Sequence, residues 1–207
     1  HSDKVGQCIR CKPPCYIAEQ CGNRQWVLQM GEGYYGRHGT LGIATPQANV
    51  TAETEFRALL PRGVACATVR MASDEPLPED RLRAYFSEID QTLDRFDTLA
   101  MGAVGLACTG SSYLLGHAAV EASLAKLGAR RQQPVISAAT AIERALNHIG
   151  AHSVALICPY PEWLLEAAER HWQERGFALA DRFSLDPHQQ DTRAIYGLSP
   201  EIAAEQI

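Results

Sequence analysis

The sequence VGLACTGSSYLLG, residues 104–116, carries the strongest structural signal in the chain. A short apolar run ends at Cys108, small hydroxyl-bearing residues follow at once, and helix-compatible sequence comes next. We expect residues 100–107 to form a buried parallel strand, with Cys108 at its carboxyl end. Open α/β sheets bind their ligands at this edge. The segment therefore predicts a cysteine thiol at a ligand-binding edge.

The residues after Cys108 would form a polar loop at the start of a helix. Thr109, Gly110, Ser111 and Ser112 offer backbone N–H groups and hydroxyl donors, and a helix dipole adds partial positive charge. Such a loop can hold a carboxylate, and the same field is expected to lower the pKa of the thiol. The alternative is that Cys108 is only a packing residue, because free cysteines are among the most buried residue types.

Composition limits the classes of protein to consider. The 207 residues are 46% hydrophobic and 21% charged, which is typical of a globular protein, and the formal net charge is −5. We find no basic block, so nucleic acid is not expected as a partner. No apolar run reaches the roughly 18 to 20 residues of a membrane span, and no signal peptide is apparent at the start. We therefore expect a soluble, cytoplasmic protein without membrane association.

Seven cysteines are unevenly distributed along the chain. An odd number without a signal sequence favours reduced thiols over a disulfide framework. Four of them crowd the start, and thiolates at short spacing can ligate zinc or an iron–sulfur cluster; they are Cys8, Cys11, Cys15 and Cys21. Their spacing matches no standard metal motif in full. The favoured interpretation is that residues 1–36 form a cysteine-rich extension that does not bind metal.

From Thr40 onward the pattern alternates between strands and helices, which is typical of a doubly wound parallel sheet. Two strand–proline–helix units, at residues 42–46 and 155–159, suggest two similar lobes facing each other across a cleft. We expect a first α/β lobe over 37–131 and a second over 132–207. The expected strands are 41–45, 64–70, 100–107, 134–137, 152–158 and 177–185, and the expected helices are 51–60, 82–93, 113–127, 140–149 and 161–175.

Three motifs in this order resemble the aspartate/glutamate racemase superfamily, in the branch of maleate cis-trans isomerases and arylmalonate decarboxylases. They are GIATPQANVTAETEF at 42–56, LACTGSSYLLG at 106–116 and ALICPYPEWLLEAAERHWQERGF at 155–177. The resemblance runs from about Thr40 to the end of the chain. It implies two pseudo-symmetric Rossmann-like lobes with parallel sheets and a cofactor-independent active site between them.

The resemblance also implies roles for individual residues. Cys108 matches the first-lobe cysteine that attacks the double bond in maleate isomerases and exchanges a proton in racemases. Asn49 matches a carboxylate-binding asparagine, and Tyr160 matches a hydrogen-bond donor from the other lobe. The carboxylate-cradling loop matches Thr109, Gly110 and Ser111. The implied activity is isomerisation or racemisation of a small carboxylic or dicarboxylic acid. Decarboxylases of this branch have glycine at the first cysteine position, so Cys108 disfavours the decarboxylase alternative.

The chain departs from the family pattern in its second lobe. The family's second catalytic cysteine lies beyond Tyr160, and the sequence ends at Ile207 before that position, while Cys158 is too close to Tyr160 to serve. We expect either an incomplete second lobe or a mechanism without this thiol. Homo-oligomerisation or a separate polypeptide would then complete the lobe. A non-catalytic subunit that binds an acid or serves assembly is the alternative from another class.

Several other residues have simpler interpretations. Asn49 can bond its own backbone in a turn, and Tyr160 can be a half-buried ring with a satisfied hydroxyl. Cys66 and Cys158 are expected in the core of strands. Glu53 and Glu55 complement a helix dipole. A solvated or capping role is expected for His117, His148 and His171.

Overall fold

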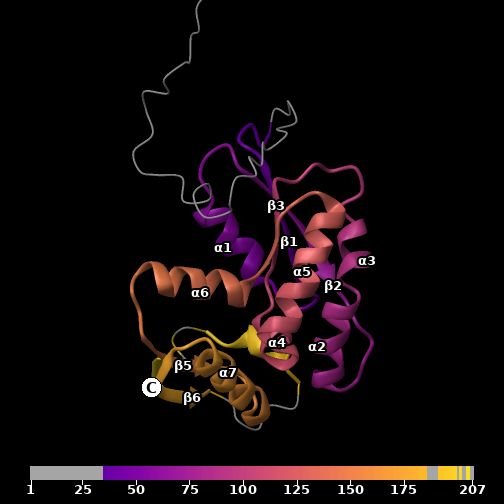
Figure 1. The fold of residues 1–207 in the computed structure, drawn as a ribbon. Coiled ribbons are helices and arrows are strands. Elements are labelled where there is room, and N and C mark those ends of the chain that lie inside the picture. The colour runs from indigo at the N-terminus through magenta and orange to yellow at the C-terminus, as the bar shows by residue number, and fades with distance from the viewer. Residues whose placement is uncertain (1–34, 186–190, 200, 202–203, 206–207) are drawn as a thin grey trace, which may run out of the picture.

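The computed structural model describes residues 35–185, 191–199, 201 and 204–205. The cysteines at 8, 11, 15 and 21 lie outside this part, so the metal-site alternative is not addressed by the structure. The described residues form two separate parallel sheets with helices packed around them (Figure 1). The prediction of a mixed α/β fold with parallel strands is therefore confirmed.

The larger sheet contains four parallel strands in the order β2-β1-β3-β4. They are β1 (Thr40–Pro46), β2 (Ala65–Met71), β3 (Ala103–Leu106) and β4 (Val135–Ser137). The two central strands are rich in small and branched apolar residues, and Ile43 and Val104 are fully buried. Such strands are covered on both faces, as expected for a parallel sheet. Their carboxyl ends share one edge of the sheet.

Helices cover both faces of this sheet (Figure 1). One face carries α1 (Thr51–Leu59), while α2 (Pro78–Ser87), α3 (Ile89–Asp94) and α5 (His117–Arg131) lie on the other. At the carboxyl edge lies the short helix α4 (Thr109–Leu115), and α6 (Ala138–His148) leads away toward the smaller sheet.

Two helices predicted as continuous are interrupted. The expected 82–93 helix is divided at Glu88, between α2 and α3. The expected 113–127 helix is divided at Gly116, whose φ of +82° lies in the region that glycine adopts without steric cost. The second of these segments, α5, runs beyond the expected end at 127 to Arg131 and is capped by Gln132 in a left-handed conformation. In both stretches the helical spacing of apolar residues continues across the break. The sequence pattern therefore did not predict that either helix is interrupted.

The smaller sheet contains β5 (Ser153–Cys158) and β6 (Ala178–Ser184), joined by α7 (Glu162–Glu174). A 3₁₀-helix, η1 (Ala194–Gly197), follows further along the chain. The expected lobe boundary at residues 131/132 differs from the sheet assignment. Residues 135–137 were expected in the second lobe, but β4 pairs with β3 in the larger sheet. The strand is short and apolar, so its sequence carries no information on which sheet it joins.

Two apolar cores match the two sheets. The larger core surrounds β1 and β3, and the smaller one forms between β5 and α7 around Leu156, Leu165 and Trp172. Tyr113 and Tyr160 pack against both cores. Full burial of an aliphatic or aromatic side chain contributes roughly 1.5 to 3 kcal/mol, so each core is a substantial source of stability.

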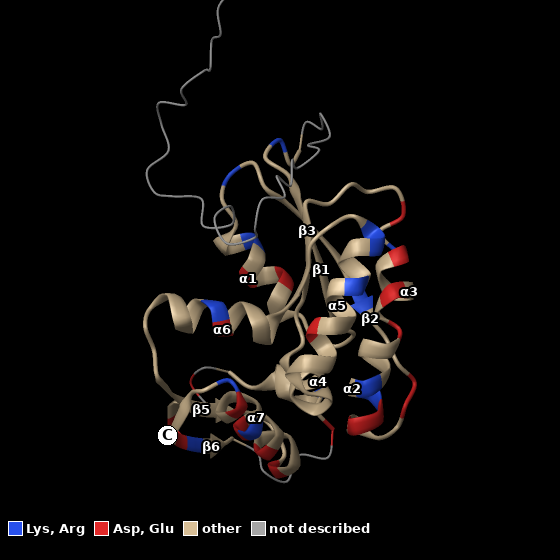
Figure 2. Ribbon diagram, in the orientation of Figure 1, with Lys and Arg blue, Asp and Glu red and all other residues tan. Residues whose placement is uncertain are grey.

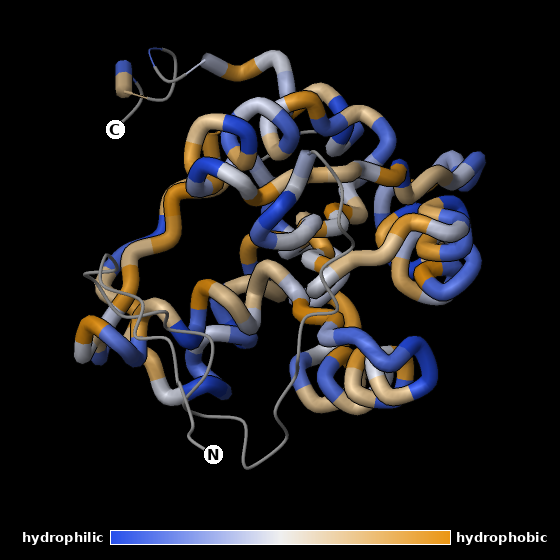
Figure 3. Tube along the Cα trace, turned by 90° about the horizontal axis from the view of Figure 1, so that it is seen from above, coloured by the Kyte–Doolittle hydropathy of each residue, from blue (hydrophilic) through white to orange (hydrophobic). Residues whose placement is uncertain are grey.

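Charged residues lie along the outer helices, where they alternate with apolar residues (Figures 2 and 3). At the end of α5, Arg130 and Arg131 pair with Asp90 of α3 at 2.5 and 2.6 Å. Exposed pairs of this kind contribute about 0 to 1 kcal/mol each. Within the described part of the chain, no helix combines the length and the apolar character needed to cross a membrane.

Candidate active site

Cys108 lies at the carboxyl edge of the larger sheet, as predicted. β3 ends at Leu106, and Cys108 is the residue that precedes α4, in an extended conformation. Its Sγ lies 3.4 Å from the Ser111 Oγ, and Ser111 and the backbone of Gly110 act to lower its pKa. The polar residues expected in a loop after Cys108 instead form the first turn of α4, which begins at Thr109.

The protonation state of the thiol differs from the prediction. Burial raises the pKa of Cys108 above its ordinary value of 9.0, and the hydrogen bonds from Ser111 and Gly110 offset this rise only in part. Loss of hydration penalises the thiolate more than a few donors stabilise it. The expectation of a lowered pKa was therefore wrong for the ligand-free site. Cys108 rests as a thiol at neutral pH.

Ser111 fixes the geometry of the first turn of α4. Its hydroxyl is buried and donates to the Leu82 carbonyl at 2.8 Å, so the same oxygen is free to accept from the Cys108 thiol at 3.4 Å. A methyl group on Gly110 would lie 3.3 Å from Leu82 and 3.6 Å from Leu164. The first turn of α4 is thus held tightly between α2 and α7.

A hydrogen bond connects the two sheets beside the thiol. The hydroxyls of Thr109, at the start of α4, and Tyr160, between β5 and α7, lie 2.7 Å apart. Burial raises the pKa of Tyr160 strongly, and it raises the pKa of Tyr113 to about 12. The Tyr113 and Tyr160 rings contact edge to face, with centroids 6.3 Å apart. Both phenols therefore remain neutral and can donate hydrogen bonds near Cys108.

Asn49 lies in the loop after β1. Its Oδ1 accepts hydrogen bonds from the backbone N–H groups of Thr51 and Ala52, at 2.9 and 3.1 Å, and so caps the first turn of α1. Arg70 also donates to the Asn49 carbonyl oxygen. The local bonding considered as an alternative is therefore present. Because it occupies the side-chain oxygen, the amide nitrogen remains the end that can face a ligand.

Two tyrosines near the thiol were not predicted as site residues. Tyr85 of α2 is buried, and Tyr196 of η1 is half-buried; both interact electrostatically with Cys108. Tyr85 falls within the helix expected over 82–93, and its local sequence does not mark it as a site residue. The sequence around Tyr196 has no periodicity that indicates an element. The positions of these two tyrosines depend on tertiary packing, which the local sequence around them does not predict.

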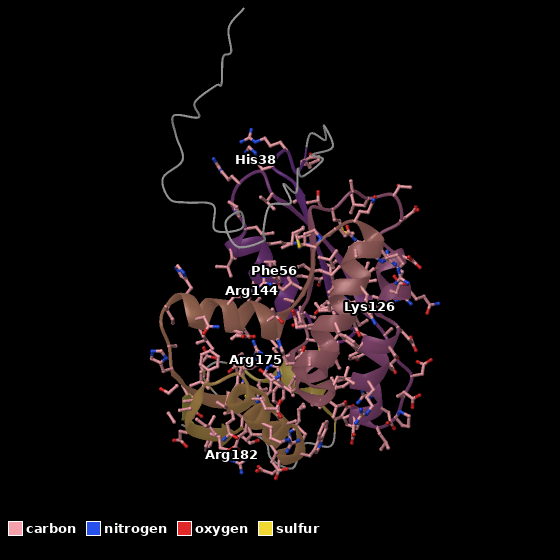
Figure 4. The ribbon with its side chains drawn as sticks, viewed as in Figure 1. His38, Phe56, Lys126, Arg144, Arg175 and Arg182 are labelled. Carbon is pink, nitrogen blue, oxygen red and sulfur yellow. The ribbon has the colours of Figure 1, made fainter. Side chains whose placement is uncertain are left out.

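His171 differs most from its expected solvated role. Its side chain is 3% exposed, and its ring lies against Tyr113 and Trp172 at centroid distances of 5.0 and 5.1 Å. Neither ring nitrogen has a hydrogen-bond partner among the described residues. The reason is its position on the inner face of α7, which packs against α4. Arg175, which is labelled in Figure 4, directly follows α7 and forms an ion pair with Glu143 of α6.

We expect the burial of His171 to make the fold sensitive to acid. Burial and the nearby Arg175 and His117 lower the pKa of His171 below 6.5. A base with a depressed pKa contributes full stability above its unfolded pKa and loses it as pH falls below about 6.5. The free energy of unfolding, measured by urea titration from pH 8 to pH 5, should fall in the wild type. In His171→Leu it should fall less and, at pH 8, stay within about 1 kcal/mol of wild type. Parallel pH profiles would contradict this assignment.

The other cysteine and acidic residues considered in the sequence analysis are half-buried or form ion pairs. Cys66 and Cys158 are half-buried, and burial raises the pKa of Cys158 to about 11. Glu53 pairs with Arg70 at 2.5 Å. Among the residues that the structure describes, no group of three or more histidine, cysteine or acidic side chains is placed to hold a metal ion.

The fold and this site define an α/β protein with a cysteine, hydroxyl donors and an amide at the carboxyl edge of a parallel sheet. No protein-family model matches the chain. A maleate isomerase of Geobacillus stearothermophilus is 28% identical over 165 residues, which cover 72% of this chain and 64% of that protein. A maleate isomerase of Nocardia farcinica is 29% identical over 155 residues, covering 70% and 61%.

Solved structures show the same similarity. A variant of the Nocardia farcinica maleate cis-trans isomerase with a covalently bound succinylcysteine intermediate has a TM-score of 0.68 at 25% identity, covering 82% of this chain and 73% of that one. An arylmalonate decarboxylase structure has a TM-score of 0.60 at 18% identity, covering 80% and 68%. The latter supports the fold alone.

The chain is therefore similar to maleate isomerases in sequence and shares the fold of maleate isomerases and arylmalonate decarboxylase. The resemblance to this branch of the aspartate/glutamate racemase superfamily is confirmed. The chain spans 64% of the length of the first of these relatives.

Proposed function

We propose that this protein is a cofactor-independent isomerase that interconverts the cis and trans forms of a small unsaturated dicarboxylate through Cys108. The observation that carries the proposal is the position of the thiol. It lies at the start of α4 beside Ser111 and the Thr109–Tyr160 pair, in a fold similar to that of maleate isomerases. A related isomerase has been captured with a succinylcysteine intermediate, which fits a cysteine that adds to maleate.

The proposed reaction is reversible addition of S–H across the double bond. The Cys108 sulfur forms a bond to one alkene carbon, while the electron pair of the π bond moves toward the carboxylate on the other carbon. That carbon then takes up the proton that the thiol has lost. The resulting carbon–carbon single bond rotates. Removal of a proton and departure of the sulfur restore the double bond in the trans form and return the thiol.

The neighbouring donors would stabilise the negative charge that develops in this reaction. The Thr109 hydroxyl, at the start of α4, and the Tyr160 hydroxyl, between β5 and α7, lie 2.7 Å apart next to Cys108 in this proposal, so they can reach a carboxylate held in a cleft between two lobes. Backbone N–H groups at the start of α4 and the Asn49 amide nitrogen are the further donors in this proposal. Donors fixed before the reaction stabilise developing charge most effectively. Racemisation of a small acid by the same thiol is the related alternative.

We propose in addition that the smaller sheet is covered in the working protein, by a second copy of the chain or by another polypeptide. Ile157 of β5 and Phe183 of β6 are 49% and 40% exposed on this two-stranded sheet. Exposed apolar surface of this kind favours association. Light scattering of the purified protein tests for a homo-oligomer.

Proton NMR of the protein with maleate tests the activity directly. We expect the maleate signal to be replaced by that of fumarate, without added metal or cofactor. Phenylmalonate and each enantiomer of aspartate serve as parallel substrates for decarboxylation and racemisation. Protein that binds maleate but leaves it unchanged would support the acid-binding subunit and contradict the isomerase.

A further inference from the structure

The Ser111 hydroxyl is enclosed between the candidate thiol and helix α2. Because α4 begins at Thr109, Cys108 and Ser111 occupy the cap and the third position of this helix, whose side chains approach each other. The Ser111 Oγ lies 3.4 Å from the Cys108 Sγ and 2.8 Å from the Leu82 carbonyl oxygen. Ser111 is only 4% exposed, so its hydrogen-bond partners are these protein groups.

The direction of the two hydrogen bonds follows from the chemistry of the groups. A carbonyl oxygen can only accept, so the single proton of the Ser111 hydroxyl is directed to Leu82. The Ser111 oxygen then offers only lone pairs to the sulfur, and the Cys108 S–H is the donor of the 3.4 Å hydrogen bond. The resting site therefore contains a directed chain, from the Cys108 thiol to Ser111 and from Ser111 to Leu82.

Negative charge on the sulfur would reverse this chain. A thiolate has no proton to donate, so the Ser111 hydroxyl can rotate about its C–O bond and donate to the sulfur instead. Because Leu82 lies inside α2, its carbonyl keeps the backbone N–H one turn along the helix as a partner. A hydrogen bond to a charged acceptor is roughly twice as strong as a neutral one, which favours the rotated hydroxyl.

We propose that Ser111 is a positioning residue for Cys108, whose hydroxyl accepts a hydrogen bond from the resting thiol and turns to donate to the sulfur when the sulfur carries negative charge. The proposal rests on the proposed function, because it takes Cys108 as the reacting thiol. In that reaction the proton lost by the sulfur still goes to the substrate carbon, and Ser111 neither gains nor loses a proton. Its hydroxyl therefore serves the thiol, and not the carboxylate that the resemblance implied for this segment.

The other ionisable side chains packed with the thiol are phenols. Tyr85 of α2, Tyr113 of α4 and Tyr160 after β5 belong to the same apolar cluster as Cys108. Burial raises the pKa of all three phenols above 10.0, as it does for Tyr196 of η1. These groups stay neutral at pH 7 to 9, so the pH dependence of Cys108 reactivity in that range reports on the thiol itself.

Infrared spectroscopy tests the resting hydrogen bond without substrate. Subtracting the spectrum of the corresponding Cys108→Ser protein isolates the S–H stretching band of Cys108. Ser111→Ala, which keeps a good helix former in α4, should shift this band to higher wavenumber because the S–H has lost its acceptor. Ser87→Ala is the matched control, since exposed Ser87 also donates to an α2 carbonyl, that of Ala84 at 3.2 Å, and its removal should leave the band unchanged. An unshifted band in Ser111→Ala would overturn the proposal.

Alkylation of Cys108 by iodoacetamide tests the hydrogen bond to the charged sulfur. Between about pH 7 and pH 9 the rate follows the thiolate fraction, so Ser111→Ala should lower it about tenfold, the effect of losing one donor to a charged group. Ser111→Thr keeps a hydroxyl and should react within about threefold of wild type. A serine that only anchors α4 to α2 would leave the Ser111→Ala rate at the wild-type value, and this result would overturn the proposal.

Turnover of maleate distinguishes a role toward the sulfur from a role toward the carboxylate. Ser111→Ala should lower kcat about tenfold and change KM less than about threefold, because Ser111 acts only once charge develops on the sulfur. A raised KM with unchanged kcat would assign Ser111 to carboxylate binding and overturn the proposal. The expected infrared and alkylation results without turnover of maleate in the wild type would support Ser111 and contradict only the isomerase.

Discussion

Replacement of Cys108 by serine is expected to lower maleate turnover by a factor on the order of 10³ or more. A serine hydroxyl is a far weaker nucleophile toward an alkene than a thiol, because the thiol ionises much more readily. The substitution keeps the side-chain volume and a hydrogen-bonding group near Ser111, so the fold should be retained. Initial rates by NMR, with circular dichroism spectra for both proteins, provide the measurement.

Cys66→Ser is the matched control for this substitution. Cys66 lies on β2 and, like Cys108, is half-buried and forms no disulfide. Its turnover should stay within about twofold of wild type, as expected for a residue outside the site. Equal losses in the two variants, or full activity in Cys108→Ser, would contradict a nucleophilic role for Cys108.

Removal of the Tyr160 hydroxyl is the second change with a large expected effect. Tyr160→Phe should reduce kcat about 10²-fold to 10³-fold, the usual cost of losing one donor to developing negative charge. The ring keeps its contacts with Tyr113, so stability should change little. Steady-state kinetics and thermal unfolding of the variant check both parts of the prediction.

Thr109→Val separates the two partners of the hydrogen bond. If Thr109 acts by orienting the Tyr160 hydroxyl at 2.7 Å, the double variant should be about as slow as Tyr160→Phe alone. Fully additive losses would mean that the two hydroxyls act independently. A Tyr160→Phe enzyme with wild-type kcat would show that the hydroxyl only joins the two sheets.

Much of the fold follows from local patterns. Apolar runs ending in proline, as at Pro46, located strands within one or two residues, and the helix expected over 161–175 matches α7 to within one residue at each end. Patterns failed where packing determines the outcome. The sequence around Val135 indicates a strand, but pairing with β3 depends on how the chain returns to the sheet. At Gly116 the helical spacing of apolar residues is the same before and after the break, so this spacing did not predict two helices.

The strand–helix junction predicted the position of Cys108 at a sheet edge. The resemblance drew attention to Tyr160, whose hydroxyl lies 2.7 Å from that of Thr109, and the functional roles of these residues stay predictions. The raised pKa of Cys108 reflects burial by segments distant in sequence, which no local motif reports. The burial of His171 was not predicted for the same reason, since it depends on the packing of α7 against α4.

The most direct test of the account is the alkylation of Cys108 by iodoacetamide, followed by peptide mass spectrometry with and without maleate. We predict that maleate slows modification of Cys108 specifically and leaves Cys66 and Cys158 unaffected. Without maleate, the rate at Cys108 should continue to rise with pH beyond 9.0, as its raised pKa requires. Modification of Cys108 at the same rate in saturating maleate would contradict a substrate site at this thiol.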